Sequence, residues 1–317
     1  MDALNNGFQE VVGIVADLDA SARNLCTALG FEVRHSGAVP DGALALWGLS
    51  GRMARETLIG HPDSQRGHIR LIQLDGAPAP RMRDGGQAWD TGGIFDINIR
   101  ALQNIEPLHQ AMGLSGFLSP APIVDWDFGP LSVREVVENN ADGLAIALMQ
   151  RVAPPLAGYE AIGGNASWVF NSTQVVPDFD AARALYCDAL GWKPVQESVQ
   201  VHEDGKNCMG LPLGLAPGVT ARIGIYQSQG QMQGSTEIIA FDCGGHDFSA
   251  ADVPGRGWAA LCFPVSDVAG FARKARQAGC AVSNPVEFEW DPHGRVRGIS
   301  ARTRWGARLD ALESLSD

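Results

Sequence analysis

The chain contains the stretch VADLDASARNLCTALGF at Val15–Phe31, which returns as VPDFDAARALYCDALGW at Val176–Trp192. At a constant offset, eight of the 17 aligned positions are identical, whereas average residue frequencies predict about one identity by chance. Each copy predicts a helix, because an Asp caps its first turn, apolar side chains recur with the helical period and a glycine ends it. The repeated stretch therefore indicates an internal duplication.

Strand-like runs surround each predicted helix. Segments rich in β-branched and aromatic residues precede and follow it, which predicts strands at these places. In the first copy these runs are QEVVGIV (9–15), FEVRHSG (31–37), ALALWGL (43–49) and HIRLIQL (68–74). In the second copy they are SWVFNSTQVV (167–176), WKPVQES (192–198), NCMGLPL (207–213) and ARIGIYQ (221–227). The unit is thus one strand, one helix and three further strands, a βαβββ module.

A weaker unit of the same kind follows each copy. IFDINIRA (94–101) and ALCFPVSD (260–267) each lead into a predicted helix that ends at a glycine. A segment rich in Pro and Gly, VAPPLAGYEAIGGN at 152–165, indicates a linker. The prediction is an α+β protein of four βαβββ modules in two tandem halves, residues 1–152 and 163–317.

Composition narrows the classes of partner. The net charge of −12 and the absence of a Lys/Arg cluster argue against nucleic acid, and the same acidity argues against an anionic membrane surface. The N-terminus does not resemble a signal peptide, no run is long enough for a transmembrane helix, and the six cysteines form no CxxC pair. We expect a soluble, cytoplasmic protein with a small-molecule substrate, for which a homodimer is an open option.

The four modules, with DLDAS and FDAAR opening the two matched helices and LGF and LGW closing them, resemble the vicinal oxygen chelate superfamily. This superfamily includes glyoxalase I, extradiol dioxygenases and bleomycin resistance proteins. The resemblance implies that each half forms a cup-shaped, curved mixed sheet with its helices outside. It also implies that metal-dependent members hold a metal in the cup, with ligands on the first and last strands of the modules.

The family pattern places the first-strand ligand seven residues before the helix-capping Asp. The positions that the resemblance assigns to the first cup are Glu10, Arg70, Ile94 (with Asp96 nearby) and Ala147, and those of the second cup are Asn171, Gly224, Ala260 and Asp310. Neither set offers the three N or O ligands that a catalytic divalent site usually needs. We therefore predict no metal and no other cofactor, with Fe, Mn or Zn as the alternative if the ligands are misregistered.

Without a metal, carboxylates that point into apolar cups are candidate acid/base groups. We predict Glu10, Asp310 and Asn171 as catalytic residues. Candidate substrate-binding residues are Arg70, Gln73, Tyr226, Trp126 and Trp290. Structural alternatives stay open: Arg70 with Glu10 as an ion pair between strands, Asp310 as a solvated rim charge, Gln73 and Tyr226 as strand ends, and both Trp residues as core.

Three functions follow. The preferred one is an enzyme that acts on a small hydrophobic, aromatic or carbonyl-bearing molecule by isomerase- or lyase-type acid/base chemistry. The second is a metal-free binding or resistance protein. The third is a metal-dependent ring-cleaving dioxygenase.

Overall fold

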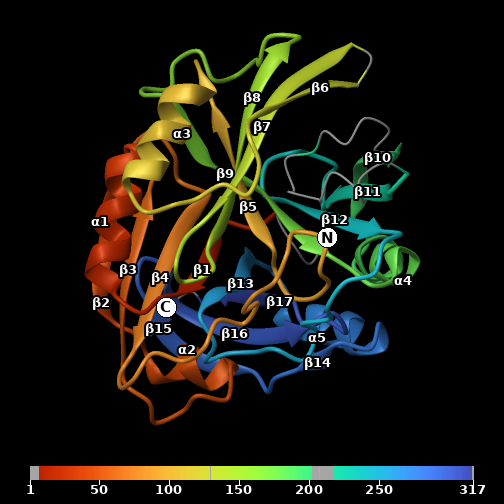
Figure 1. The fold of residues 1–317 in the computed structure, drawn as a ribbon. Coiled ribbons are helices and arrows are strands. Elements are labelled where there is room, and N and C mark those ends of the chain that lie inside the picture. Colours follow the sequence, from red (N-terminus) through yellow and green to blue (C-terminus); the bar gives the residue numbers. More distant parts are fainter. Residues whose placement is uncertain (1–6, 129, 202–206, 208–217, 316–317) are drawn as a thin grey trace.

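The computed structural model describes residues 7–128, 130–201, 207 and 218–315, and Figure 1 shows its fold. The first module comprises β1 (Glu10–Ile14), α1 (Leu18–Leu29), β2 (Glu32–Ala38), α2 (Asp41–Leu46), β3 (Ala54–Gly60) and β4 (His68–Leu74). The second comprises β5 (Asp96–Ala101), α3 (Ile105–Leu114), β6 (Val124–Phe128), β7 (Leu131–Asn139) and β8 (Ala145–Ala153).

The second half repeats this order. The third module comprises β9 (Ala166–Val175), α4 (Phe179–Arg183), the π-helical segment η1 (Ala184–Ala189), β10 (Lys193–Val201), β11 (Thr220–Gln227) and β12 (Ser235–Phe241). The fourth comprises β13 (Gly257–Pro264), α5 (Val268–Gln277), β14 (Ala281–Val282), β15 (Val286–Trp290), β16 (Gly294–Arg302) and β17 (Arg308–Ser314). The predicted α+β fold of four modules, with curved mixed sheets and helices outside, is confirmed (Figure 1).

The modules pair across the two halves. One sheet, here called the terminal sheet, joins the first and fourth modules in the order β14-β16-β17-β13-β1-β4-β3-β2, with β15 paired to β16. The other, the central sheet, joins the second and third modules in the order β10-β11-β12-β9-β5-β8-β7-β6. The expectation that each half forms its own sheet is therefore wrong. The backbone edge of a first strand can pair with any similar edge, so the repeat pattern identifies a module but not its partner.

The repeated helix forms as its capping residues predict. The Asp17 carboxylate accepts a hydrogen bond from the Ala20 amide at 2.9 Å, and Asp178 accepts one from Ala181 at 3.0 Å. Gly30 ends α1 with a φ of 70°, a conformation that costs a residue with a Cβ. The apolar faces of α1, α3, α4, η1 and α5 pack on the outer faces of the two sheets, which leaves the inner face of each sheet to form a cup.

Two predicted strands need correction. Residues 43–49 lie in and just after the helix α2, and the third strand of the first module is β3. In the third module the last strand is β12 and not the run at 221–227, which is the third strand, β11. Most of the predicted strand at 207–213 lies outside the described residues.

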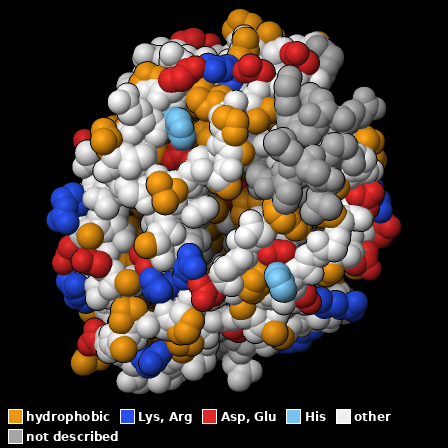
Figure 2. Space-filling model, in the orientation of Figure 1, with side chains coloured by type: hydrophobic (Ala, Val, Ile, Leu, Met, Phe, Trp, Pro, Cys, Tyr) orange, Lys and Arg blue, Asp and Glu red, His pale blue; other side chains and the backbone are white. Residues whose placement is uncertain are grey.

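The visible surface carries side chains of every type, and the described helices have at most 12 residues. On the face shown in Figure 2, acidic and basic side chains are interspersed, and hydrophobic side chains gather beside the undescribed segment. Within the described part of the chain, no helix is both long and apolar enough to cross a membrane.

Candidate functional site

The cup of the terminal sheet is filled by protein. Helix α2 lies in it and packs against β15 and β16, and a Cβ added to Gly42 would lie only 2.5 Å from Cβ of Phe288. The buried apolar side chains that fill the cup come from α2 and from both modules of the sheet: Leu44, Leu46, Trp47, Val12, Ile72, Ala260, Trp290 and Val296. Such packing leaves little space for a ligand.

Arg70 lies buried at the base of this cup and holds two carboxylates. Its Nε and Nη2 donate to Glu10 at 2.9 and 3.2 Å, and Nη1 donates to Glu56 at 2.9 Å. The guanidinium lies 4.3 Å from the centre of the Trp290 ring, whose Nε1 donates to Glu56. Burial alone would raise the pKa of Glu10, but Arg70 and His293 hold it well below its ordinary range. The geometry is that of the structural ion pair that the sequence left open.

Asp310 is also buried in the terminal sheet. Trp47 Nε1 donates to its carboxylate at 2.8 Å, and burial raises the pKa of Asp310 against the hydrogen bonds from Ser300 and Trp47. Since its side chain is fully buried, the alternative of a solvated rim charge is wrong. Arg308 and Arg302 pair with Asp252 instead.

The cup of the central sheet, in contrast, contains an open cavity of about 150 Å³. A cavity of this size, lined by apolar side chains, can hold one benzene ring. Apolar side chains from β6, β8, β9 and β11 form its walls, among them Trp126, Met149, Phe170, Ile223 and Ile225. The cavity has the concave, mostly apolar shape that is typical of small-molecule sites.

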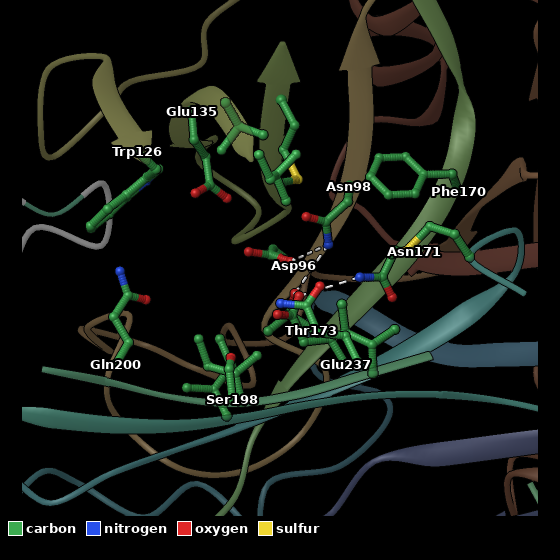
Figure 3. A pocket seen from close by; sticks show the side chains of 18 of the residues that line it. Asp96, Asn98, Trp126, Glu135, Phe170, Asn171, Thr173, Ser198, Gln200 and Glu237 are labelled. Carbon is green, nitrogen blue, oxygen red and sulfur yellow. Dashed lines mark hydrogen bonds between the residues drawn. The ribbon is translucent and has the colours of Figure 1, made fainter. Parts of the chain in front are cut away.

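A row of polar side chains lines this cavity along its three central strands (Figure 3). The register pairs Thr173 of β9 with Asp96 of β5 on one side and with Glu237 of β12 on the other. One step along the sheet, Asn171 of β9 pairs with Asn98 of β5. Because alternate residues of a strand share a face, all of these side chains point into the same cup.

Hydrogen bonds join the row. Thr173 Oγ1 donates to Glu237 at 3.2 Å and accepts from Asn98 Nδ2 at 3.1 Å. Asn171 Nδ2 donates to the same Glu237 oxygen at 3.3 Å, and Asn98 Nδ2 also lies 3.2 Å from Asp96 Oδ1. The two carboxyl groups are thus fixed by neutral donors.

Burial changes the protonation of both carboxyl groups. Burial, and then the charge of Glu135, raises the pKa of Glu237 to about 7, although Thr173 and Asn171 oppose the shift. Burial raises the pKa of Asp96 well above its ordinary range, with Glu237 and Glu135 adding to the effect. At neutral pH, Glu237 can therefore release or accept a proton, and burial shifts Asp96 towards its protonated form.

The donor sets of both cups fit the family's metal poorly. In the terminal sheet, a guanidinium lies between the carboxylates where a metal ion would be held. In the central sheet, the three central strands supply two carboxyl groups, two amides and a hydroxyl without an imidazole, and Glu135 of β7 adds a third carboxyl group to the lining. Across residues 7–128, 130–201, 207 and 218–315, no group of three or more His, Cys, Asp or Glu side chains is arranged to hold a metal ion.

The structure brings together only two of the predicted site residues, Asn171 and Trp126, at the open cavity. Arg70, Glu10, Trp290 and Asp310 lie in the filled cup of the terminal sheet. Their predicted roles in catalysis and substrate binding stay predictions.

Gln73 and Tyr226 lie away from the cavity. Gln73 ends β4, where its Oε1 accepts from the backbone N–H of Leu18 at 3.1 Å. Tyr226 is buried on the helix side of the sheet, where it stacks on Tyr186 and donates to Glu197.

Sequence reasoning missed Glu237, Thr173 and Asn98 as site residues. Glu237 was missed because the last strand of the third module was predicted at 221–227, whereas it is β12 at Ser235–Phe241. The run STEIIAF at 235–241 carries a β-branched pattern that could have identified β12. On that strand Glu237 occupies the position at which the family pattern expects a carboxylate.

Comparisons with known proteins agree with this fold. A sequence model described as "Glyoxalase/Bleomycin resistance protein/Dioxygenase superfamily" matches residues 169–309, and a comparison with curated protein sequences finds no match. Glyoxalase I from Zea mays superposes with a TM-score of 0.62 at 13% identity, over 97% of this chain and 92% of that chain. A mutant of the same enzyme reaches a TM-score of 0.64 at 14% identity, over 97% and 94%.

A proposed dioxygenase from Bacillus subtilis superposes with a TM-score of 0.59 at 10% identity, over 100% of this chain and 87% of that chain. At such low sequence identity, the structural similarity supports a shared fold but not a shared reaction. Residues 169–309 thus match the glyoxalase, bleomycin resistance protein and dioxygenase superfamily, and the whole chain has the vicinal oxygen chelate fold of that superfamily.

Proposed function

We propose that the protein is an enzyme that moves a proton on a small hydrophobic, carbonyl-bearing or aromatic molecule bound in the cavity of the central sheet. Glu237 is the acid/base group. The observation that carries the proposal is the pKa of Glu237, raised to about 7 by burial in the wall of an open apolar cavity. A general base works best when its pKa lies near the working pH.

The row of polar residues suggests how the reaction proceeds. The Glu237 carboxylate takes a proton from a carbon next to the substrate carbonyl. The electron pair of the broken C–H bond forms a C=C bond, and the π pair of the C=O bond moves onto the carbonyl oxygen. In this proposal Asp96 is protonated, as its raised pKa favours, and donates its O–H to that oxygen as charge develops, the role that a buried neutral carboxylic acid can fill. Return of the proton to another carbon gives an isomerase, whereas loss of a leaving group gives a lyase.

Neighbouring side chains position these groups. Asn171 and Thr173 donate to one oxygen of Glu237, which leaves the other oxygen to face the substrate. Asn98 donates to Asp96 and to Thr173, and Thr173 in turn donates to Glu237, so this chain of hydrogen bonds connects the two carboxyl groups. Trp126 and Phe170 provide flat apolar walls that exclude water from the reacting carbon (Figure 3).

The test is proton exchange in D₂O, followed by NMR on a panel of aryl ketones and phenylpyruvate. We expect wild-type protein to exchange the proton next to the carbonyl of at least one probe, and Glu237→Gln to lose this exchange. Glu10→Gln, in the filled cup, is the matched control and should keep it. Exchange that survives in Glu237→Gln but disappears in Glu10→Gln would return the acid/base role to the terminal sheet.

A binding or resistance protein is the alternative for the same cavity. It predicts that a probe binds tightly while its protons never exchange above the buffer rate, in wild-type protein as in Glu237→Gln. That outcome would overturn the enzymatic proposal.

A further inference from the structure

One end of the cavity of the central sheet is positively charged. Asp96, Asn98 and Arg100 occupy successive inward positions of β5, and all three line the cavity. Their spacing places the backbone of Arg100 about 13 Å from that of Asp96, at 3.3 Å per residue. The cavity thus extends from the acid/base row to a guanidinium.

Arg100 lacks the counter-charge that a buried arginine normally has. It is 5% exposed, and its buried Nε has no hydrogen-bond partner. The guanidinium instead stacks on the Phe170 ring at 3.9 Å. A buried cation without a carboxylate is costly unless something else neutralises it, and protein chains rarely keep one without a role.

A second arginine faces the same place. Arg151 of β8 lines the cavity, and its buried Nε also has no hydrogen-bond partner. Burial, and then the charge of Arg100, lowers the pKa of Arg151, so the two cations lie close enough to repel each other. Among the residues that the structure describes, neither guanidinium forms an ion pair with a carboxylate, whereas Arg70 forms two.

The acid/base carboxyl groups of the cavity lie elsewhere in the sheet. Asp96 and Glu237 belong to the row four residues away along the strands. Glu135 of β7 also lines the cavity and shares the row of Arg100, with Met149 of β8 between them, but its charge acts on Glu237 and Asp96 and raises the pKa of both. The two ends of the cavity therefore differ in charge, and this difference can orient a ligand.

We infer that the ligand of this cavity is a small apolar or aromatic molecule that carries a carboxylate, and that this carboxylate pairs with Arg100 and Arg151. A carboxylate accepts two parallel hydrogen bonds from a guanidinium, and the Nε atoms that lack partners are donors suited to this geometry. The apolar body then lies along Phe170 and Trp126. Its far end faces Glu237, and this last orientation alone rests on the proposed function.

The experiment measures binding of benzoate and phenylacetate by calorimetry, with benzamide and phenylacetamide as neutral analogues of equal shape and with inorganic phosphate as a plain anion. We expect each acid to bind about 10- to 100-fold more tightly than its amide, the range that a charge-assisted hydrogen bond gives. Arg100→Met and Arg151→Met should each remove that preference, and added salt should weaken only the acids.

Control variants keep the result interpretable. Arg222→Met changes an arginine that lies outside the cavity and stacks on Phe179, so it should leave binding unchanged. If wild-type protein binds the acids but exchanges no proton of any probe, the proposed function is rejected and the anion site is retained.

Equal affinity for acids and amides, or unchanged acid binding in both arginine variants, would overturn the inference. Phosphate that competes with benzoate as strongly as phenylacetate does would also overturn it, because the site would then recognise charge alone. Thermal unfolding of each variant confirms that it is folded before its binding is compared.

Discussion

Thr173 lies between the two buried carboxyl groups of the open cavity, and its hydroxyl donates to Glu237 at 3.2 Å. The same hydroxyl also lowers the pKa of Asp96, although burial outweighs this effect. One neutral side chain thus links two acids whose backbone positions pair across β9. In the terminal sheet a guanidinium lies between the carboxylates instead, so the two cups of one fold surround their acids with different partners.

The half-buried Glu237 should make stability depend on pH. Its pKa rises from an ordinary 4.5 to about 7 on folding, so between these values the folded state holds a proton that the unfolded state has lost. Stability contributed by this group is therefore present below pH 4.5 and declines as the pH rises to 7, by about 3 kcal/mol in total.

We expect Glu237→Gln to be more stable than wild type at pH 8, with a difference that shrinks towards pH 5. Urea unfolding at several pH values measures this difference. A difference that stays constant over the whole range would contradict the raised pKa of Glu237.

The buried network of Arg70, Glu10 and Glu56 should stabilise the fold without affecting ligand binding in the cavity. Arg70→Met leaves Glu10 and Glu56 buried without their cation, and removing one partner of a buried ion pair typically costs about 3–5 kcal/mol. Ligand binding in the central sheet should not change. Denaturant unfolding and calorimetry with one probe measure the two effects.

The triple variant Glu10→Gln, Glu56→Gln, Arg70→Met is the matched control, because it removes the charges together. We expect it to recover much of the lost stability. A single Arg70→Met variant as stable as wild type would show that the network contributes little.

The matched stretches at Val15–Phe31 and Val176–Trp192 predicted the modules because caps and apolar periodicity are local properties. Pairing of β1 with β13, and of β5 with β9, is decided by contacts between distant segments. No local pattern distinguishes these partners from others, so the sequence could not show which residues share a cup. The cups expected from the sequence therefore combined positions that the fold separates.

Helix α2 shows how a tertiary contact overrides a local pattern. The run ALALWGL at 43–49 is apolar throughout and reads as a buried strand as easily as a buried helix. It forms a helix that fills a cup, preceded by Pro40. The sequence pattern places Asp96 near a family position, whereas it does not identify β12, the strand that carries Glu237, as the last strand of its module.

Because α2 packs tightly against β15, alanine substitutions at two helical glycines should have different effects on stability. Gly42 and Gly113 both lie in helices without a positive φ, but a Cβ on Gly42 would clash with Phe288, whereas one on Gly113 would meet nothing within 4 Å. Gly42→Ala should destabilise the protein by about 1–3 kcal/mol through overpacking, and Gly113→Ala should stabilise it by up to about 1 kcal/mol. Equal effects in thermal unfolding would show that α2 is loosely seated.

Metal content is the last prediction, and it follows from the donor sets. Arg70 already supplies the positive charge between the carboxylates of the terminal sheet, and the raised pKa of Asp96 makes it a weaker ligand in the central one, because a ligand carboxyl must lose its proton. Elemental analysis of tag-free protein should therefore find Fe, Mn, Zn and Ni well below one equivalent, and added metals should leave the unfolding temperature unchanged. Stoichiometric metal that Glu237→Gln loses would instead make Glu237 a ligand and favour the dioxygenase alternative, because a ring-cleaving enzyme needs a redox metal in the cavity.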